Sequence, residues 1–260
     1  MMKFAVIGNP ISHSISPRLH NFAIKELNLN AFYGRILLED INQLKKPFGY
    51  LNGANITVPF KEEAVQICDY LDVHSKKIGS VNTIIKNKDE FYGYNTDALG
   101  FLKSINEFKN IKSALIIGAG GTARAMAYTL NLNNIRVEIV NRSQKRAANF
   151  KDFEFFTWEN FKPKSYDLII NSTSAGLIDD ELPLPFDLLK ETFEKAKFAY
   201  EVIYNKPTNF LNLAKSLDLI TKNGKDMLIF QAALALNLFF SNKLDEEKII
   251  SYMKKAINLR

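Results

Sequence analysis

Short apolar runs alternate with amphipathic segments over the first hundred residues. Lys3 to Gly8 and Phe32 to Leu38 have the length and composition of buried strands, and Pro17 to Leu27 between them has helical periodicity. A third strand is predicted at Ala54 to Val58, with a helix at Lys61 to Leu71 after it. This alternation is typical of an α/β domain with a mostly parallel sheet.

Two strand-like segments predict a hairpin in the same part of the chain. Val81 to Lys86 and Glu90 to Tyr94 are separated only by residues 87–89, Asn-Lys-Asp, which favour a turn. The hairpin would add one antiparallel element to the first sheet.

The alternation of strands and helices starts again near residue 113. Strands are predicted at residues 114–117, 136–140, 167–171 and 198–204, with a helix at residues 123–132. Such repeated βα units predict a second sheet that is doubly wound.

Composition narrows the class of protein. Of the 260 residues, 47% are hydrophobic, which is enough for two modest cores. Cys68 is the only cysteine, so we expect no internal disulfide and a reducing, cytoplasmic location. The longest apolar run, Met227 to Phe240, is shorter than the roughly 20 residues of a membrane span, so no membrane partner is expected. The net charge of +6 is scattered among acids, and we expect no nucleic-acid partner.

A glycine-rich turn lies at the start of the second alternation. Residues 118–123 read Gly-Ala-Gly-Gly-Thr-Ala, follow the strand at 114–117 and open the helix at 123–132. In the G-x-G-x-x-G/A fingerprint, glycines let the backbone approach a pyrophosphate, and the helix N-terminus stabilises its charge. The alternative is a tight turn with no ligand. We therefore predict a Rossmann-type dinucleotide-binding domain.

The end of the next strand indicates which dinucleotide binds. An NAD site usually ends this strand in an acid, whereas here it runs into Asn141 and Arg142. Glu138 has the expected spacing from the turn but lies about 10 Å short of the strand end, at about 3.3 Å per residue. Arg142 and Arg146 can hold a 2′-phosphate through their guanidinium groups, and Ser143 can add a hydrogen bond. The prediction is NADP, and the alternative is a solvated basic loop.

These signals predict the domain organisation. Residues 1–100 would form a substrate-binding catalytic domain and residues 101–223 a Rossmann NADP-binding domain. Helices in residues 224–260 would pack back on the first domain.

Two serines at a predicted helix start are candidates for binding an anionic substrate. Ser16 is a good N-cap and Pro17 suits the first helical position, so Ser14 and Ser16 would lie at a positive helix end. The alternative is that Ser16 only caps the helix. His13 and His20 have neither metal-ligand spacing nor an acid cluster, and we interpret both as structural or surface residues with no metal site.

Lys61 and Asp97 are the candidate acid–base pair. Lys61 follows a predicted strand end, where α/β sheets bind ligands, and a lysine in a first helical turn is biased toward the neutral amine. Asp97 could orient Lys61 and share a substrate hydroxyl with it. The alternatives are a solvated lysine and an aspartate that caps a helix.

Together these segments resemble the shikimate dehydrogenase family, in order and along nearly the whole chain. The motifs that carry the resemblance are Gly8 to Pro17, Asn55 to Lys61, Gly79 to Thr83, Asn95 to Asp97, the glycine turn, Asn141 to Ser143, Asn171 to Gly176, Tyr204 to Thr208 and Met227 to Ala232. Relatives often have a second glycine where Asp226 stands, and some have methionine where Ile203 stands.

The resemblance implies reversible NADPH-dependent reduction of 3-dehydroshikimate to shikimate, in the pathway to chorismate and the aromatic amino acids. Lys61 and Asp97 would be catalytic, and the substrate residues would be Ser14, Ser16, Thr57, Lys61, Asn82, Asp97, Tyr204 and Gln231. The cofactor residues would be Gly118, Ala119, Gly120, Gly121, Thr122, Asn141, Arg142, Ser143, Gln144, Lys145, Arg146, Thr173, Ile203, Gly224 and Met227.

Two other functions compete with this interpretation. A quinate or dual quinate/shikimate dehydrogenase would share the fold and the lysine–aspartate pair, but its NAD-using version would need an acid at position 141. A sensor that binds shikimate or dinucleotide without catalysis would not need Lys61 and Asp97. The expected partner is a small-molecule substrate, and a homodimer is the assembly we consider.

Overall fold

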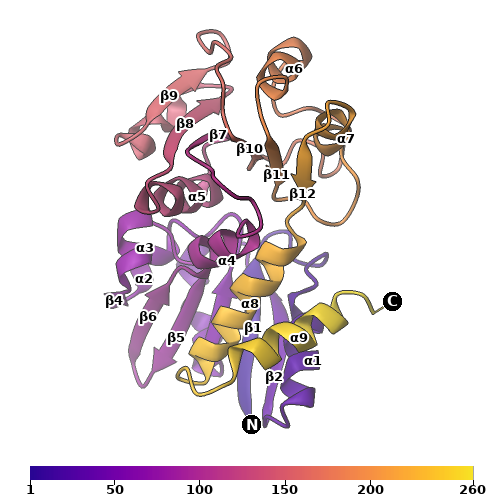
Figure 1. Ribbon diagram of the computed structural model, residues 1–260. Helices are drawn as coiled ribbons and strands as arrows, with labels where there is room; N and C mark the ends of the chain where they lie inside the picture. Colours follow the sequence, from indigo (N-terminus) through magenta and orange to yellow (C-terminus); the bar gives the residue numbers. More distant parts are fainter. Residues whose placement is uncertain (260) are drawn as a thin grey trace. The chain divides into compact units, whose positions relative to one another are not determined.

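The computed structural model describes residues 1–259, which form two compact units (Figure 1). The first unit contains Met1–Gly100 and the chain from Leu228 onward, and the second contains Phe101–Met227. The second boundary lies four residues beyond residue 223, because Met227 belongs to the buried core of the second unit.

A six-stranded sheet forms the centre of the first unit. Its strand order is β2-β1-β3-β5-β6-β4, and β5 alone is antiparallel to its neighbours, so the sheet is mostly parallel as predicted. The strands are β1 (Met2–Gly8), β2 (Ala31–Leu37), β3 (Gly53–Ile56), β4 (Tyr70–Leu71), β5 (Thr83–Asn87) and β6 (Glu90–Tyr94).

Successive side chains of a strand point to opposite sides of this sheet, and each side is covered by its own hydrophobic core. In β1, Phe4 and Val6 face a core shared with helices α1, α8 and α9, whereas Ala5 and Ile7 face the other core. The helices and short 3₁₀ turns that lie wholly or partly in the unit are α1 (Ser16–Glu26), η1 (Ile41–Gln43), η2 (Lys46–Gly49), α2 (Ala64–Ile67), α3 (Val73–Ile78), α4 (Thr96–Ser104), α8 (Lys225–Phe239) and α9 (Glu246–Ala256).

The predicted helix at Lys61 to Leu71 is wrong. Residues 58–63 form turns, α2 makes a single helical turn, and β4 follows it. This segment pairs with the edge of β6: Tyr70 pairs with Tyr92, and the Asp69 carboxylate accepts a hydrogen bond from the Phe91 backbone N–H at 2.8 Å. Tertiary pairing therefore overrides a local pattern that resembled a helix.

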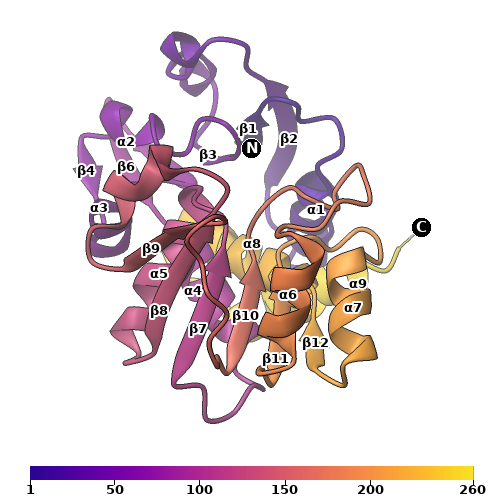
Figure 2. The ribbon, with the colours of Figure 1, turned by 90° about the horizontal axis from the view of Figure 1, so that it is seen from above.

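The second unit contains a six-stranded, all-parallel sheet with the order β12-β11-β10-β7-β8-β9 (Figure 2). Read from β9, and with the strands of this sheet counted in chain order, this is the 3-2-1-4-5-6 order of the Rossmann fold, so the doubly wound prediction is confirmed. Its strands are β7 (Ser113–Ile117), β8 (Arg136–Asn141), β9 (Glu154–Thr157), β10 (Leu168–Asn171), β11 (Phe198–Glu201) and β12 (Ile220–Lys222).

Three details of this sheet differ from the sequence prediction. The edge strands β9 and β12 were not expected, because each is only three or four residues long. The strand β11 ends at Glu201 rather than at residue 204, so Tyr204 lies in the loop that follows.

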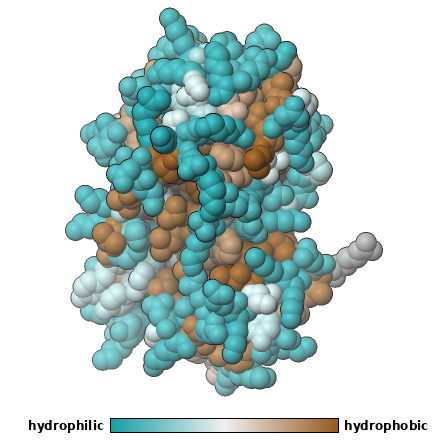
Figure 3. Space-filling model, viewed as in Figure 1, coloured by the Kyte–Doolittle hydropathy of each residue, from teal (hydrophilic) through white to brown (hydrophobic). Residues whose placement is uncertain are grey.

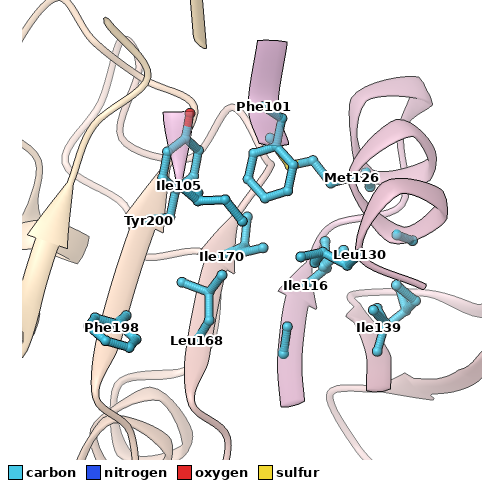
Figure 4. Packing of buried hydrophobic residues seen from close by; sticks show 14 of the residues in the cluster. Phe101, Ile105, Ile116, Met126, Leu130, Ile139, Leu168, Ile170, Phe198 and Tyr200 are labelled. Atoms are coloured by element: carbon cyan, nitrogen blue, oxygen red, sulfur yellow. The ribbon is translucent and has the colours of Figure 1, made fainter. Parts of the chain in front are cut away.

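Two hydrophobic cores cover the two faces of the second sheet. Figure 4 shows one of them, in which Ile116, Ile139 and Ile170 of the sheet pack with Met126 and Leu130 of α5. The other core involves the alternate strand positions and two further helices. The helices and the 3₁₀ segment of the unit are α5 (Gly121–Leu132), η3 (Gln144–Phe150), α6 (Phe186–Phe193) and α7 (Asn209–Ser216).

The face of the protein shown in Figure 3 is mostly hydrophilic, with smaller hydrophobic patches between the polar side chains. Within residues 1–259, no helix has both the length and the apolar character that crossing a membrane requires.

We expect Leu130→Ala to lower the free energy of unfolding by about 2 to 5 kcal/mol, because Leu130 is fully buried and its removal leaves a cavity. Leu132→Ala on the same helix is the control: Leu132 is 56% exposed, and its change should stay within about 0.5 kcal/mol. Urea denaturation followed by circular dichroism measures both. Equal losses would contradict the packing described for α5.

Candidate functional site

Lys61 and Asp97 form an ion pair at one edge of the first sheet. Lys61 lies in the turn after β3, and Asp97 lies in the first turn of α4, directly after β6. Because β3 and β6 run in the same direction, both residues follow carboxyl ends of strands. The Lys61 Nζ to Asp97 Oδ2 distance is 2.7 Å, and the side chains are 16% and 8% exposed.

The structure changes two of the arguments made for this pair. Lys61 precedes α2 by three residues and is not in a first helical turn, so the helix-dipole argument for a neutral amine does not apply. Asp97 is the second residue of α4 and does not cap it, because Asn95 Oδ1 accepts the Ala98 N–H at 3.2 Å. The Asp97 carboxylate is therefore free of helix capping and pairs with Lys61 instead.

Asn82 holds the second oxygen of the Asp97 carboxylate. Its side-chain Nδ2 donates to Asp97 Oδ1 at 2.9 Å, and the Asn82 side chain is buried just before β5. Asp97 thus accepts from Lys61 on one oxygen and from Asn82 on the other, as an ionised carboxylate does. Of the three donors of an ammonium group, Lys61 directs one at Asp97.

The two predicted anion-binding serines lie side by side at the start of α1. Ser14 Oγ and Ser16 Oγ are 3.2 Å apart, and both residues are half-buried. The expectation that Ser16 is the N-cap is wrong: Ser16 is the first residue of α1, and Ile15 occupies the cap position without a side-chain hydrogen bond. The helix start therefore does not use the Ser16 hydroxyl to cap itself.

Thr57 and Gln231 also belong to the first unit. Thr57 follows β3, and its backbone N–H donates to the Ile7 carbonyl near the carboxyl end of β1. Gln231 lies on α8 where α8 approaches α4: a Cβ on Gly100 would lie 2.8 Å from Gln231 Cβ. Because Gly100 is one helical turn after Asp97, Gln231 lies against the helix that carries Asp97.

The glycine turn of the second unit has the geometry that a dinucleotide fingerprint requires. Gly118 has φ +109°, and a Cβ there would lie 2.7 Å from Ser172 Oγ. Gly120 is the N-cap of α5 and has open space where its Cβ would point. A ligand phosphate can therefore approach the backbone at Gly120 and meet the N–H groups of the first turn of α5.

The basic segment after β8 lies next to this turn. Asn141 ends β8, Arg142 is exposed, and residues 144–150 form η3. Arg146 reaches back, and its Nη1 donates to the Ala119 carbonyl at 3.4 Å. Ser143, Gln144 and Lys145 are the remaining predicted residues in this segment.

Glu138 lies within β8 rather than at its carboxyl end. It is buried inside β8, where its Oε2 accepts hydrogen bonds from the Tyr166 hydroxyl at 2.7 Å and from Lys164 Nζ at 3.1 Å. The residue with the spacing of an NAD-binding acid is therefore part of an internal network.

A buried polar network supports Thr173 and was not assigned from the sequence. Asn171 Oδ1 accepts from the Thr173 backbone N–H at 3.0 Å and from its hydroxyl at 2.7 Å, while Asn171 Nδ2 donates to Glu201 Oε1 at 2.8 Å. The other carboxylate oxygen of Glu201 accepts from Thr208. Burial raises the pKa of Glu201. A polar residue that ends an apolar parallel strand is the signal that could have found both Asn171 and Glu201.

The last three predicted cofactor residues lie after β11 and at the start of α8. Ile203 and Met227 are buried, and the Gly224 N–H donates to the Ile203 carbonyl at 3.2 Å. A Cβ on Gly224 would lie 2.1 Å from the Val202 carbonyl oxygen, so no side chain fits there. Tyr204, predicted to bind substrate, belongs to this second unit and is half-buried in the loop after β11.

In residues 1–259, no three side chains among His, Cys, Asp and Glu gather in a way that could hold a metal ion. Burial raises the pKa of the Cys68 thiol to about 12, so the thiolate form is scarce at neutral pH.

Comparison with known proteins identifies the family. Residues 6–84 match the family model described as the shikimate dehydrogenase substrate binding domain. The NADP(+) shikimate dehydrogenase of Helicobacter hepaticus is 47% identical, covering 98% of each chain, and that of Helicobacter pylori strain 26695 is 42% identical, covering 98% of this chain and 99% of its own. The chain belongs to the shikimate dehydrogenase family.

A solved shikimate dehydrogenase shares the fold over the full length. The crystal structure of shikimate 5-dehydrogenase from Thermus thermophilus in complex with NADP(H) and shikimate is 32% identical, with a TM-score of 0.86. The alignment covers 98% of this chain and all of that one. The family model ends before Asp97, but these full-length relatives extend the family assignment across both units.

We expect Gly118→Ala to destabilise the protein by more than about 1 kcal/mol, because its positive φ is unfavourable for alanine and its Cβ would collide with Ser172. Gly120→Ala should stay within about 0.5 kcal/mol, since its φ is −87° and its Cβ position is open. Thermal unfolding of the two variants tests this difference. A Gly118→Ala protein as stable as the Gly120→Ala protein would rule out the described turn geometry.

Proposed function

We propose that this protein is an NADP-dependent shikimate dehydrogenase, which reversibly reduces 3-dehydroshikimate to shikimate in the pathway to chorismate and the aromatic amino acids. The observation that carries the proposal is the Lys61–Asp97 ion pair at strand carboxyl ends, in a chain that belongs to this family. The pair gives a proton donor and a fixed carboxylate beside it, as reduction of a carbonyl to an alcohol requires.

The residues of the first unit would provide the acid–base part of the reaction. NADPH, when bound, supplies the hydride that adds to the carbonyl carbon. Lys61 donates a proton to the carbonyl oxygen as negative charge develops there, and the oxygen becomes the hydroxyl of shikimate. Asp97 keeps the Lys61 ammonium oriented through their 2.7 Å contact. In the oxidative direction, Lys61 accepts the proton.

The remaining polar residues of the first unit would bind the substrate. The adjacent Ser14 and Ser16 hydroxyls can donate hydrogen bonds to a carboxylate. Thr57, Asn82 and Gln231 have donors and acceptors suited to ring hydroxyls. Tyr204 belongs to the second unit and is proposed to bind substrate on the strength of the family motif alone.

Residues of the second unit fit NADP better than NAD. The open space at Gly120 and the N-terminus of α5 suit a pyrophosphate. The strand β8 ends in Asn141 and Arg142 rather than in an acid, and Glu138 is bonded internally to Tyr166. Arg142 and Arg146 are proposed to hold the 2′-phosphate, with Asn141 to Lys145 and Thr173 lining the nucleotide.

Lys61→Ala should lower kcat by about 10² to 10⁴, the usual contribution of a positioned acid–base group, while changing the KM for shikimate much less. The matched control is Lys86→Ala, since Lys86 is a partly buried lysine of the same unit whose Nζ bonds only a backbone carbonyl, that of Phe48. Its kcat should match the wild type. NADPH formation from shikimate, followed by absorbance, measures both. A loss confined to KM would reject the acid–base role.

Replacing both Arg142 and Arg146 by alanine should raise the KM for NADPH at least about tenfold and leave the KM for NADH nearly unchanged, because each guanidinium lost removes a charged hydrogen bond to the 2′-phosphate. Lys151→Ala, which removes one exposed cation just after η3, is a control for the loss of a nearby positive charge. Equal losses with the two cofactors would contradict the NADP assignment.

The same assay separates the alternatives. Turnover of quinate comparable to that of shikimate would indicate a dual-specificity quinate/shikimate dehydrogenase. Binding of shikimate with no turnover under any combination of substrate and cofactor would indicate a sensor. A homodimer and a cytoplasmic location are further proposals from sequence, and light scattering of the purified protein tests the first.

A further inference from the structure

A row of polar side chains crosses a sheet face that is otherwise apolar. Tyr33 of β2, Asn55 of β3 and Thr83 of β5 are all buried on the face covered by α1, α8 and α9. Gly53, two residues before Asn55, packs against Phe239 of α8 and so marks that face on β3. Burying polar groups is unfavourable unless each is hydrogen-bonded, and apolar residues could fill the same space.

The orientation of the Asn82 amide follows from its obligate partners. The Thr96 backbone N–H can only donate, and it lies 2.8 Å from Asn82 Oδ1. The Asn82 Nδ2 group therefore faces the Asp97 carboxylate, which can only accept, at 2.9 Å.

The orientation of the Asn55 amide is determined in the same way. Its Nδ2 faces the Asn82 backbone carbonyl at 3.3 Å and Thr83 Oγ1 at 2.9 Å. Its Oδ1 therefore accepts the Tyr33 hydroxyl at 2.6 Å. Thr83 receives a hydrogen from Asn55 and so donates its own to Asn82 Oδ1, at 3.1 Å.

Every donor in this row consequently points toward Asp97. The sequence of donors runs from Tyr33 to Asn55, then to Thr83, then to Asn82, and ends on Asp97 Oδ1. Bonds that share one direction polarise and strengthen one another. Asp97 Oδ2 accepts from Lys61 at the opposite side of the same carboxylate.

The Tyr33 hydroxyl, at the end of the row far from Asp97, is kept protonated and can therefore donate a hydrogen bond. The His20 ring of α1 stacks on the Tyr33 ring at 4.0 Å between centroids and 5° between planes. Burial lowers the pKa of His20 to about 3 and raises the pKa of Tyr33 well above its usual value. At neutral pH, Tyr33 therefore keeps its hydroxyl hydrogen beside an uncharged imidazole.

We propose that Tyr33, Asn55 and Thr83 are positioning residues for the reaction: their one-way hydrogen-bond row holds the Asn82 amide on Asp97 and so orients the carboxylate that faces Lys61. The proposal rests on the proposed function, since positioning matters only if Lys61 and Asp97 react. Neither Tyr33 nor Thr83 touches the Lys61–Asp97 pair, and both act through Asn82.

Thr83→Val and Thr83→Ser test the row directly. Valine keeps the shape of threonine but cannot donate to Asn82, whereas serine keeps the hydroxyl. We expect Thr83→Val to lower kcat/KM for shikimate about tenfold, corresponding to one hydrogen bond in the network, with the KM for NADP unchanged. Thr83→Ser should keep kcat/KM for shikimate within about twofold of the wild type. A twofold change corresponds to less than half of the activation free energy of a tenfold loss, so the two variants can be told apart. A valine variant as active as the serine variant would overturn the proposal.

Tyr33→Phe tests the far end, with Tyr200→Phe as the matched control. Tyr200 is equally buried and its hydroxyl bonds Ser104, but it belongs to the second unit. Both variants lose one buried hydroxyl, so similar falls in thermal stability are expected. Only Tyr33→Phe should lower kcat/KM for shikimate. Equal activities for the two variants would show that Tyr33 serves stability alone and would refute its positioning role.

A readout that does not need turnover separates this proposal from the proposed function. In ¹⁵N NMR spectra, the Asn82 side-chain NH₂ should exchange slowly with water in the wild type and in Thr83→Ser, and faster in Thr83→Val. An inactive wild type with this exchange pattern would refute the proposed dehydrogenase while retaining the hydrogen-bond row. An active wild type with equal exchange in both variants would refute the row.

Discussion

The ion pair between Lys61 and Asp97 is the interaction on which the first unit depends. Its two members are 36 residues apart in sequence and largely removed from water, so each charge must be compensated inside the protein. The fold does this by ending β3 and β6 at the same edge of the sheet and by supplying Asn82 to the second carboxylate oxygen. An ammonium group held in this way is oriented before any substrate arrives, which reduces the entropy that binding must overcome.

The glycine turn of the second unit has a geometry that suits an anionic ligand. The turn after β7 leaves the N–H groups at the start of α5 without helical partners, and the open space at Gly120 leaves room for a phosphate. Gly118 closes this turn against Ser172, at the point where the sheet order reverses between β7 and β10. The same strand ends therefore form the turn and position the loop that carries Thr173.

Buried polar networks in the two units follow one physical rule. Asn55 and Thr83 in the first unit, and Asn171 and Glu201 in the second, lie among apolar strands with their hydrogen-bonding groups paired. A network of this kind specifies one side-chain arrangement, because rotating any amide would leave a buried donor or acceptor unpaired. In each unit the network leads to a residue proposed to contact a ligand, Asn82 in one and Thr173 in the other.

Local sequence determined most strands, the glycine turn and the lack of an acid at the end of β8, and it indicated Lys61 and Asp97 as candidates because each follows a predicted strand end. These features depend on nearest neighbours: strand periodicity, glycine conformations and the residues that follow a strand. Only the tertiary structure decided that residues 61–71 form turns, one helical turn and β4, because Tyr70 and Leu71 pair with β6. It also decided that Ile15 rather than Ser16 occupies the N-cap position of α1, and that Tyr33, Asn55 and Thr83 form a row. Those three residues lie on strands far apart in sequence, and only the register of the sheet brings their polar atoms within hydrogen-bonding distance.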